Sequence, residues 1–530
     1  MAIIWNGDYK GLSDSAFSGP EGSFHECVGI DGHSTPGILQ AQQALARLSS
    51  LVSPSSSASP SASASPSASQ SASPSASQSN SPSASASPSS SASGSPSASV
   101  SASVSASTGD SNIDEFVKEK VVASNGYSFW FSSTSGKIWA IDSSDAITLA
   151  LTTVPTSGGA GCSGAEEYNG YIYWATESYL HRIAIADADG QWVNGVQNWN
   201  AFDVTDDTYH PMAIQDQSLF IADGNQIAMV DDATFDSEVF KLTALSHHRI
   251  SAMTSYEFDI FMGTYVADTV NEGRIIRWDT VSPSWNLSDE ISEAGINAFI
   301  KDDNYLYVNA GKEGNMYYFD GARLQLFKKV PGTYSNTKTG VVYHGSVANY
   351  QGVPIFGFSN VLGNPAPQGV YSLGSYSRDY SKVLSLDWPI SQGVTSGIKM
   401  GALAVMNGLI YAAWTDGTES GIDKLDASTK YNGAYIATKK LFTNKRHILK
   451  TMAEANVYYD SLPTGTSFTI YYKVNNGSYI ALSATEAYKD AIANAYKGRL
   501  TVPEVGSLQT KIVFNTSGNN SPTLETLEVN

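Results

Sequence analysis

The stretch Asn169-Gly170-Tyr171-Ile172-Tyr173-Trp174-Ala175 decides the fold of this chain. Its aromatic and β-branched residues favour a strand. Soon afterwards, Leu180-His181-Arg182-Ile183 provides a second strand pattern. Two short strands in such close succession predict a β-hairpin.

The same hairpin pattern recurs along residues 111–440. An aromatic residue marks the first strand of each copy: Trp130, Tyr173, Phe220, Phe261, Tyr307, Phe356 and Tyr411. The spacings between these residues, 43, 47, 41, 46, 49 and 55, match the length of a four-stranded propeller blade. Stacking in a ring buries both apolar faces of each small sheet. We therefore predict an all-β fold with a seven-bladed β-propeller; the alternative is a long two-sheet β-solenoid or sandwich array.

Composition narrows the function classes. The chain of 530 residues carries 31 Lys+Arg against 50 Asp+Glu, a formal charge of −19. An acidic surface repels nucleic acid and anionic membranes, so we expect neither as a partner. Two cysteines exclude a disulfide framework or a cysteine zinc cluster. No apolar run approaches the ~18 residues of a membrane-spanning helix, and residues 1–8 lack the features of a secretory signal.

Residues 53–110 form a low-complexity segment of serine, alanine and proline. Every odd position from Ser53 to Ser107 is serine, and the prolines that recur among them cannot donate to a strand ladder. Because it has no large side chain to bury, we predict a disordered or polyproline-II-like spacer. The alternative is a repeat expansion without a role, inside a surface loop.

The two ends of the chain differ from the repeats. Residues 1–52 are too few for a core of their own, and we expect them to dock on the propeller or to close its ring with a strand. Residues 441–530 show alternating strands, with a hairpin turn at Asn475-Asn476-Gly477. These strands predict a C-terminal β-sandwich, with one short helix from Glu486 to Lys497.

Motifs for catalysis are missing from the sequence. It contains no phosphate-binding loop, no dinucleotide fingerprint and no nucleophile elbow, and the hairpins lack the Asp-box repeat of sialidase propellers. The paired carboxylates Glu166-Glu167 and Asp302-Asp303 are sequence neighbours, whose side chains usually point apart. We interpret them as solvated turn residues and predict no catalytic residue.

Two groups of histidines have the residue types of a metal site. His25, Cys27, Asp31 and His33 cluster before the spacer, but a structural zinc site normally needs four well-placed ligands. The pair His247-His248 falls between two hairpins and is interpreted as surface. We therefore predict no metal ion and no cofactor.

Large aromatic residues between the hairpins are better candidates for binding. Trp192, Trp199 and Trp285 lie outside the hairpin cores. An indole face stacks well on a sugar ring, which suits a surface that recognises a receptor. Packing between blades is the alternative role for all three residues.

Six segments carry a resemblance to known proteins. They are Lys10-Gly11-Leu12-Ser13-Asp14-Ser15, Val28-Gly29-Ile30-Asp31-Gly32-His33-Ser34-Thr35-Pro36-Gly37, Asn125-Gly126-Tyr127-Ser128-Phe129-Trp130-Phe131, Tyr168-Asn169-Gly170-Tyr171-Ile172-Tyr173-Trp174-Ala175, Ile276-Arg277-Trp278-Asp279-Thr280-Val281-Ser282-Pro283-Ser284-Trp285-Asn286 and Gly369-Val370-Tyr371-Ser372-Leu373-Gly374-Ser375-Tyr376-Ser377-Arg378-Asp379-Tyr380. They resemble a family of tailed-bacteriophage virion structural proteins, tail-associated β-propellers from environmental phages. Members of that family carry only a short link in place of the serine repeat, so the resemblance implies an insertion there. It also implies a structural or tail-associated virion role, with no catalytic motif to transfer.

We therefore expect a virion structural protein, associated with the phage tail, that offers a binding surface to other virion proteins or to a host-surface glycan. It would assemble in the host cytoplasm, become extracellular in the mature particle and form an oligomer. One alternative is a propeller glycoside hydrolase or lyase acting on surface polysaccharide. A cluster of two or three carboxylates with an arginine at the channel mouth would favour that enzyme. A bacterial surface adhesin is the other alternative, which the missing export signal disfavours.

Overall fold

The fold of the chain is known from a computed structural model. It describes residues 3–5, 24, 26–32, 38–48, 113–152, 161–192, 196–201, 209–231, 234–266, 271–303, 305–330, 340–359, 368–374, 382–391, 398–442, 450–460, 462–475, 477–482, 487–490, 495–505 and 507–529. Within these ranges every named element is a β-strand. None of the described residues belongs to a helix with the length and apolarity that a bilayer crossing needs.

Most strands belong to four-stranded antiparallel meanders that follow one another along the chain. In the first five, the order of the strands in the sheet is their order in the sequence. These sheets are β6 (Val117–Val122), β7 (Ser128–Ser132), β8 (Ile138–Ile141) and β9 (Ile147–Leu151); β10 (Gly164–Tyr168), β11 (Tyr171–Ala175), β12 (Tyr179–Ala184) and β13 (Gln197–Ala201); β14 (Met212–Gln215), β15 (Ser218–Asp223), β16 (Gln226–Asp231) and β17 (Thr234–Thr243); β18 (His248–Tyr256), β19 (Asp259–Val266), β20 (Gly273–Trp278) and β21 (Leu287–Ile291); and β22 (Ile296–Lys301), β23 (Leu306–Ala310), β24 (Asn315–Phe319) and β25 (Leu324–Lys329).

The last repeat contains a strand from far upstream in the chain. Its own three strands are β30 (Lys399–Met406), β31 (Leu409–Thr415) and β32 (Ser420–Lys430), and the fourth is β5 (Gln43–Arg47). In the antiparallel register of β5 and β32, Leu45 lies opposite Leu425. Both leucines are buried in one apolar cluster. A strand from the beginning of the chain thus completes the sheet of the last repeat.

One repeat is not a separate sheet, which corrects the expectation of seven discrete blades. Its strands are β26 (Val347–Tyr350), β27 (Val353–Phe358), β28 (Gly369–Gly374) and β29 (Val383–Pro389). The edge of β29 pairs in parallel with β2 (Glu26–Val28), and β2 pairs with β33 (Ala434–Ala437), so the sheet continues to ten strands. An edge strand offers unpaired N–H and C=O groups for such an extension. Six blades are therefore discrete, and this repeat merges with the C-terminal strands.

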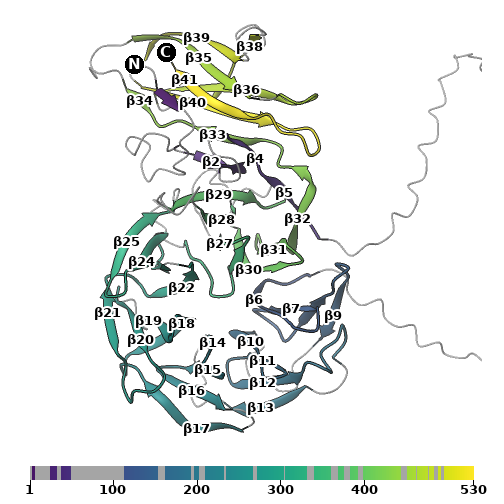
Figure 1. Cartoon of the computed structure of the whole chain (residues 1–530), viewed down its shortest axis with the longest axis vertical. Coiled ribbons are helices and arrows are strands. Elements are labelled where there is room, and N and C mark those ends of the chain that lie inside the picture. The colour runs from purple at the N-terminus through teal and green to yellow at the C-terminus, as the bar shows by residue number, and fades with distance from the viewer. Residues whose placement is uncertain are drawn as a thin grey trace, which may run out of the picture. The chain divides into compact units, whose positions relative to one another are not determined.

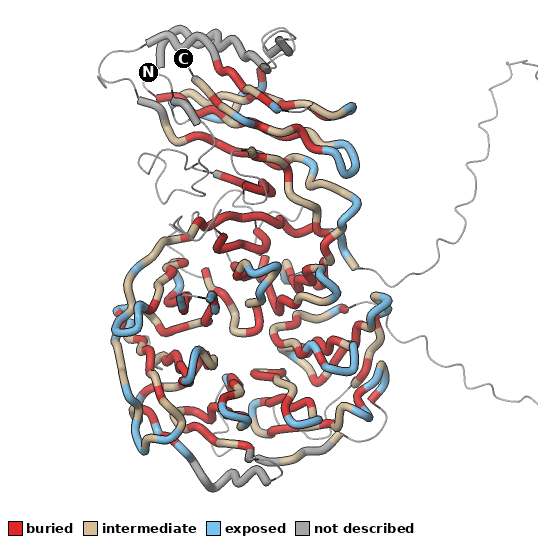
Figure 2. Tube along the Cα trace, viewed as in Figure 1, coloured by how far each residue is buried: buried red, intermediate tan, exposed pale blue. Residues whose placement is uncertain are grey.

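The first strands of the repeats lie innermost and form a closed ring. Strands β6, β10, β14, β18, β22, β26 and β30 contact one another in this order, and β30 contacts β6 (Figure 1). Side chains from neighbouring sheets share apolar clusters; Trp130 of β7 and Tyr411 of β31 belong to one of them. Figure 2 shows buried positions throughout the ring. This architecture is a β-propeller, as the repeat predicts.

The chain leaves and re-enters the propeller at neighbouring points. Leu48 follows β5, and Ile113 precedes β6. Both residues pack into the apolar cluster that the first and last sheets share. The predicted spacer, residues 53–110, lies outside the described residues.

The C-terminal strands form two sheets. One contains β1 (Ile3–Trp5), β41 (Leu524–Val529), β35 (Lys450–Tyr459), β39 (Ala495–Val505) and β38 (Ala487–Asp490). The other is the far part of the ten-stranded sheet, with β33, β40 (Ser507–Asn515), β36 (Ser467–Val474), β37 (Ile480–Ala481) and β34 (Leu441–Phe442). Buried residues of both sheets, among them Val457 and Phe514, share one apolar cluster. A small sheet of β3 (Ile30–Asp31) and β4 (Gln40–Ala41) completes the named strands.

The helix expected from Glu486 to Lys497 is wrong. The strand β38 occupies the first part of this segment, and it pairs antiparallel with the beginning of β39, where Ala487 lies opposite Gly498. Alanine, glutamate and lysine favour a helix, but such propensities are weak, and pairing with a neighbouring strand overrides them.

Candidate functional site

A short segment just before β26 crosses the centre of the propeller. His344, in the middle of residues 341–346, reaches strands on both sides of the ring. Its Nε2 donates a hydrogen bond to the carbonyl oxygen of Met253 on β18, at 3.0 Å. Its Nδ1 lies 3.6 Å from Oε2 of Glu119 on β6. Because β6 and β18 each lie two repeats away from β26, His344 links this segment to strands on both sides of the ring.

Two cavities flank this segment, and His344 lines both of them. The first has a volume of about 340 Å³ and lies at the beginnings of the inner strands; residues lining it include Lys118, Glu119, Tyr209, Asn297 and Tyr343. The second has a volume of about 520 Å³ and lies toward the ends of those strands; residues lining it include Lys120, Glu166, Thr254, Lys301 and Asn349. Several different repeats contribute to each cavity, so the closed ring assembles both of them.

Aromatic and cationic side chains shape the first cavity. Nζ of Lys118 lies 5.0 Å from the ring centroid of Tyr343, a cation–π contact. Burial lowers the pKa of Lys118, which Glu119 opposes, and burial raises the pKa of Tyr343 to about 12. Tyr209 is 40% exposed and packs edge-on against Tyr265. The cavity therefore offers one accessible aromatic ring beside polar and charged groups.

A glycine lets the crossing segment approach β6. A Cβ atom on Gly345 would lie 2.1 Å from the carbonyl oxygen of Lys118, far inside the contact distance. Only glycine therefore fits here without a shift of the backbone. This close approach brings His344 next to Glu119.

The second cavity contains two amines and one carboxylate. Burial raises the pKa of Glu166, and the charges of Lys120, His344 and Lys301 oppose this rise. Burial lowers the pKa of Lys120 and of Lys301, and Glu166 opposes both changes. Nζ of Lys120 also donates to the carbonyl oxygen of Val347, at 3.4 Å. With two amines around one carboxylate, this cavity suits an anionic group of a ligand.

The charge of His344 depends on its neighbours. Burial on its own would lower the pKa of the imidazole. The nearby carboxylate of Glu119, together with the carbonyl of Met253, outweighs burial and raises the pKa above its ordinary value. Glu119 and the Met253 carbonyl thus favour the protonated form of His344, between the two cavities.

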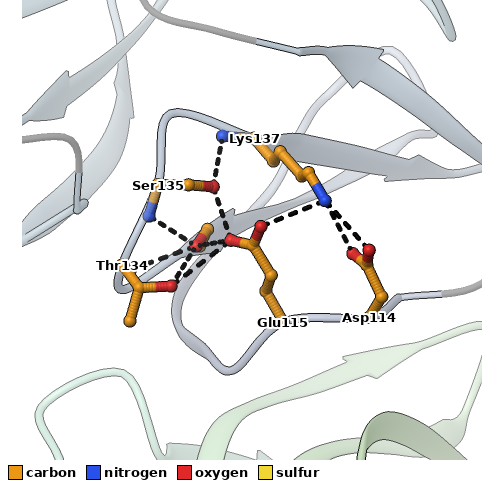
Figure 3. Close-up of polar contacts among 6 residues, drawn as sticks. Asp114, Glu115, Thr134, Ser135 and Lys137 are labelled. Carbon is orange, nitrogen blue, oxygen red and sulfur yellow. Dashed lines mark hydrogen bonds and ion pairs between the residues drawn. The ribbon is translucent and has the colours of Figure 1, made fainter.

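A polar cluster lies just before β6, the strand that carries the cavity residues Lys118, Glu119 and Lys120 (Figure 3). Oε1 of Glu115 lies 3.0 Å from Nζ of Lys137, which also pairs with Asp114 at 2.9 Å. Oε2 of Glu115 accepts hydrogen bonds from the hydroxyls of Ser132, Thr134 and Ser135. Burial would raise the pKa of Glu115, but the hydrogen bonds and Lys137 lower it. The cluster ties β6 to the turn between β7 and β8.

The three tryptophans predicted to bind a ligand do not line either cavity. Trp192 is 4% exposed and packs between Phe129 and Trp174, with ring centroids 5.0 and 5.3 Å away. This corrects the prediction for Trp192, because its indole face is covered by the core between two blades. Trp192 therefore packs between blades, which is the alternative role given for it in the sequence analysis.

Trp199 and Trp285 are half-buried. The guanidinium of Arg182 lies 4.2 Å from the ring centroid of Trp199, and Tyr173 packs against the same indole at 5.5 Å. Trp285 packs against the apolar cluster between the third and fourth sheets. A binding role for these two residues stays a prediction.

Two carboxylates interpreted as solvated turn residues are in fact enclosed. Glu166 lines the second cavity, whereas Glu167 points away and accepts a hydrogen bond from the backbone N–H of Ser124 at 2.7 Å. The side chain of Asp302 is 3% exposed and pairs with Lys382 at 3.1 Å. Alternation along a strand predicts that neighbours point apart, but it does not say which of them faces the channel.

The carboxylates do not form the cluster that the enzyme hypothesis expects. The described residues lining the two cavities include Glu119, Glu166 and Glu177 but no arginine. Lysines and His344 are interleaved with these carboxylates. The lining of the two cavities therefore combines acidic and basic groups, which can hold a polar or anionic ligand.

No model of a known protein family matches this chain, and no curated protein matches it. Solved structures with a similar fold include streptogramin B lyase, with 11% identity, coverage of 60% of this chain and 96% of the other, and a TM-score of 0.40. The WD40 domain of Pan2 from Neurospora crassa has 8% identity, coverage of 60% and 91%, and a TM-score of 0.41. The computationally designed Ika8 protein has 10% identity, coverage of 59% and 97%, and a TM-score of 0.36. Similarity at this level carries no argument about what this chain binds.

Proposed function

We propose that this chain is a binding protein without catalytic activity, a structural component of a tailed-phage virion that is associated with the tail. Its binding site is the first cavity, and its ligand is a glycan of the host surface. The main support for this choice of site is that one cavity is lined by aromatic and polar side chains from different repeats, namely Tyr209, Tyr343, Lys118 and Asn297. The proposal that the protein belongs to a virion rests only on the resemblance of its sequence to tailed-bacteriophage virion proteins.

The chemistry of this cavity favours a sugar ligand. Aromatic rings pack on the C–H faces of sugars, and convergent polar groups fix their hydroxyls. Tyr209 offers an accessible ring, while Lys118 and His344 would attract an acidic sugar. The excess of acidic residues over the whole chain disfavours nucleic acid as the ligand.

The proposal also includes two finer features of the fold. The repeat β26–β29 serves as the seventh blade. The contacts of β26 with its neighbours β22 and β30 support this assignment. The two C-terminal sheets form a β-sandwich that attaches to other virion proteins. The shared apolar cluster of these sheets supports the sandwich.

A glycan array with labelled protein tests the site. Replacing Tyr209→Ala should weaken binding by about 1–3 kcal/mol, or roughly 5- to 150-fold. Phe258→Ala is the matched control, because Phe258 is an 83% exposed aromatic residue on the turn between β18 and β19, outside both cavities. Equal effects of the two substitutions, or no effect of either, would contradict the proposed site.

Assays for released sugar test the enzyme alternative. Wild-type protein incubated with the polysaccharide of a susceptible host should release neither reducing ends nor unsaturated sugars. Release that disappears in Glu119→Gln would replace the binding proposal with a hydrolase or lyase.

A further inference from the structure

Two histidines and a glutamate meet at one corner of the fourth sheet, away from both cavities. His247 and His248 stand at the beginning of β18, and Glu272 stands just before β20. One ligand atom from each of the three residues lies within 4.8 Å of the others. His248 is fully buried, Glu272 is half-buried and His247 is exposed, so the group opens toward solvent on one side only.

The hydrogen bonds of Thr264 orient the ring of His248. Nδ1 of His248 lies 2.9 Å from the Thr264 hydroxyl oxygen. That hydroxyl donates its own proton to the carbonyl oxygen of Arg274, at 3.4 Å, and accepts the N–H of Arg274. When the hydroxyl donates to Arg274 in this way, its oxygen accepts from His248, and the imidazole proton then lies on Nδ1 with a lone pair on Nε2.

The lone pair of His248 faces a carboxylate oxygen. Nε2 lies 3.3 Å from Oε1 of Glu272, and it is buried without a hydrogen-bond partner. Two acceptors at this distance repel each other unless a cation lies between them.

The separation fits a divalent metal ion instead. Zinc binds imidazole nitrogen and carboxylate oxygen at about 2.0–2.2 Å, so two ligands of a tetrahedron lie roughly 3.3–3.5 Å apart. The 3.3 Å between His248 and Glu272 falls in this range. His247 is exposed and can rotate to take a third position. In such sites, the ring nitrogen that does not bind the metal usually donates a hydrogen bond to a fixed oxygen, which orients the imidazole.

We propose that His247, His248 and Glu272 bind a divalent transition-metal ion, with zinc as the representative ion and solvent at the fourth position. Two histidines and one glutamate are a ligand set that zinc uses elsewhere with an open position. Arg274 should weaken metal binding, because its Nε lies 3.7 Å from Oε1 of Glu272 and competes for that carboxylate. Glu290 partly offsets this competition, because it pairs with the same guanidinium at 2.6 Å.

Calorimetric titration with Zn²⁺ tests the site on the full chain, expressed without a histidine tag and dialysed against a chelator. We expect saturable binding of about one ion per chain. His247→Ala and Glu272→Gln should each weaken it at least tenfold, whereas Glu257→Gln, the same charge change on the turn at the other end of β18, should leave it within twofold. His248 itself is not substituted, because its complete burial would confound binding with folding.

Two further variants separate a built site from chance surface binding. Thr264→Val, a nearly isosteric change at an equally buried position, removes the oxygen that contacts Nδ1 of His248. It should weaken binding about 10- to 100-fold in protein whose melting curve shows that it is folded. Arg274→Gln removes a neighbouring positive charge and should strengthen binding several-fold. Absence of saturable binding would overturn the proposal. So would binding that both His247→Ala and Glu272→Gln leave unchanged, because the ion would then occupy other groups of the chain.

Discussion

His344 and Glu119 form an ion pair across the central channel, with 3.6 Å between Nδ1 and Oε2. The pair links the segment before β26 to the innermost strand of the first repeat. A raised histidine pKa in the folded state means that folding favours the protonated form. The stabilisation is fully present below the unfolded pKa, about 6.5, and is lost as the pH rises through the higher folded pKa.

This ion pair predicts a pH-dependent contribution to stability. The difference in melting temperature between wild type and His344→Gln should be larger at pH 6 than at pH 9. Because other groups titrate in the same range, the measurement is this difference at each pH, followed by circular dichroism. A difference that stays constant, or that grows with pH, would contradict the assigned role.

A second prediction concerns the polar cluster at the beginning of β6. Glu115→Ala removes the acceptor of three hydroxyls and the partner of Lys137, and should cost about 1.5–3 kcal/mol of unfolding free energy at pH 7. Because the pKa of Glu115 is lowered in the folded protein, its contribution exists above the unfolded pKa and is lost as the pH falls. Chemical denaturation at pH 7 and pH 4 measures both effects.

Glu257→Ala is the control for this experiment. Glu257 is exposed on a turn, so its loss should change the free energy by less than about 0.5 kcal/mol. Equal losses for the two glutamates would mean that the cluster adds nothing beyond surface charge.

The repeat was predictable because its period is a local property of the sequence. All seven marker aromatics, from Trp130 to Tyr411, lie on the second strands of their repeats, as β7, β11, β15, β19, β23, β27 and β31. The merging of one repeat with the C-terminal strands was not predictable. It depends on β2, which pairs with β29 and β33 over long sequence separations that no local pattern encodes.

The candidate site was harder to predict than the fold. Lys120 and Glu166 occupy ordinary strand positions, and only the closing of the ring makes them face a shared cavity. The residues of the proposed metal site are likewise brought together only by the fold. His247 and His248 are adjacent, but their partner Glu272 is brought to them by the pairing of β18, β19 and β20.

A third prediction separates packing from binding among the tryptophans. Trp192→Ala should destabilise the protein by about 3–5 kcal/mol, because it leaves a void between Phe129 and Trp174. Binding of the surviving folded protein to glycan should not change. Melting curves and array binding are measured on the same samples, alongside Tyr209→Ala, for which the opposite pattern is expected. Lost binding without lost stability in Trp192→Ala would restore its predicted contact with a ligand.

A fourth prediction concerns the serine-rich spacer. Deleting Ser53–Ser107 and bridging the ends with a short Gly/Ser linker should change the melting temperature by only a few degrees. The flanking residues Leu48 and Ile113 pack into the same apolar cluster, so a short linker can join them. The deleted residues have no large side chain to bury. A broad or missing unfolding transition in calorimetry would show that the spacer supports the fold.

The last prediction is that the N-terminal segment stays bound when the spacer is cut. Its strands β1, β2 and β5 pair with β41, with β29 and β33, and with β32, respectively. Leu39 and Leu524 also exchange two backbone hydrogen bonds, at 2.9 and 2.8 Å. After cleavage at a protease site inserted in the spacer, both fragments should elute together in gel filtration and separate only in denaturant. Leu45→Asp, which puts a charge into a buried strand position, should make the fragment dissociate more readily. Separate elution of the wild-type fragments under native conditions would mean that these pairings do not hold the segment without the covalent link.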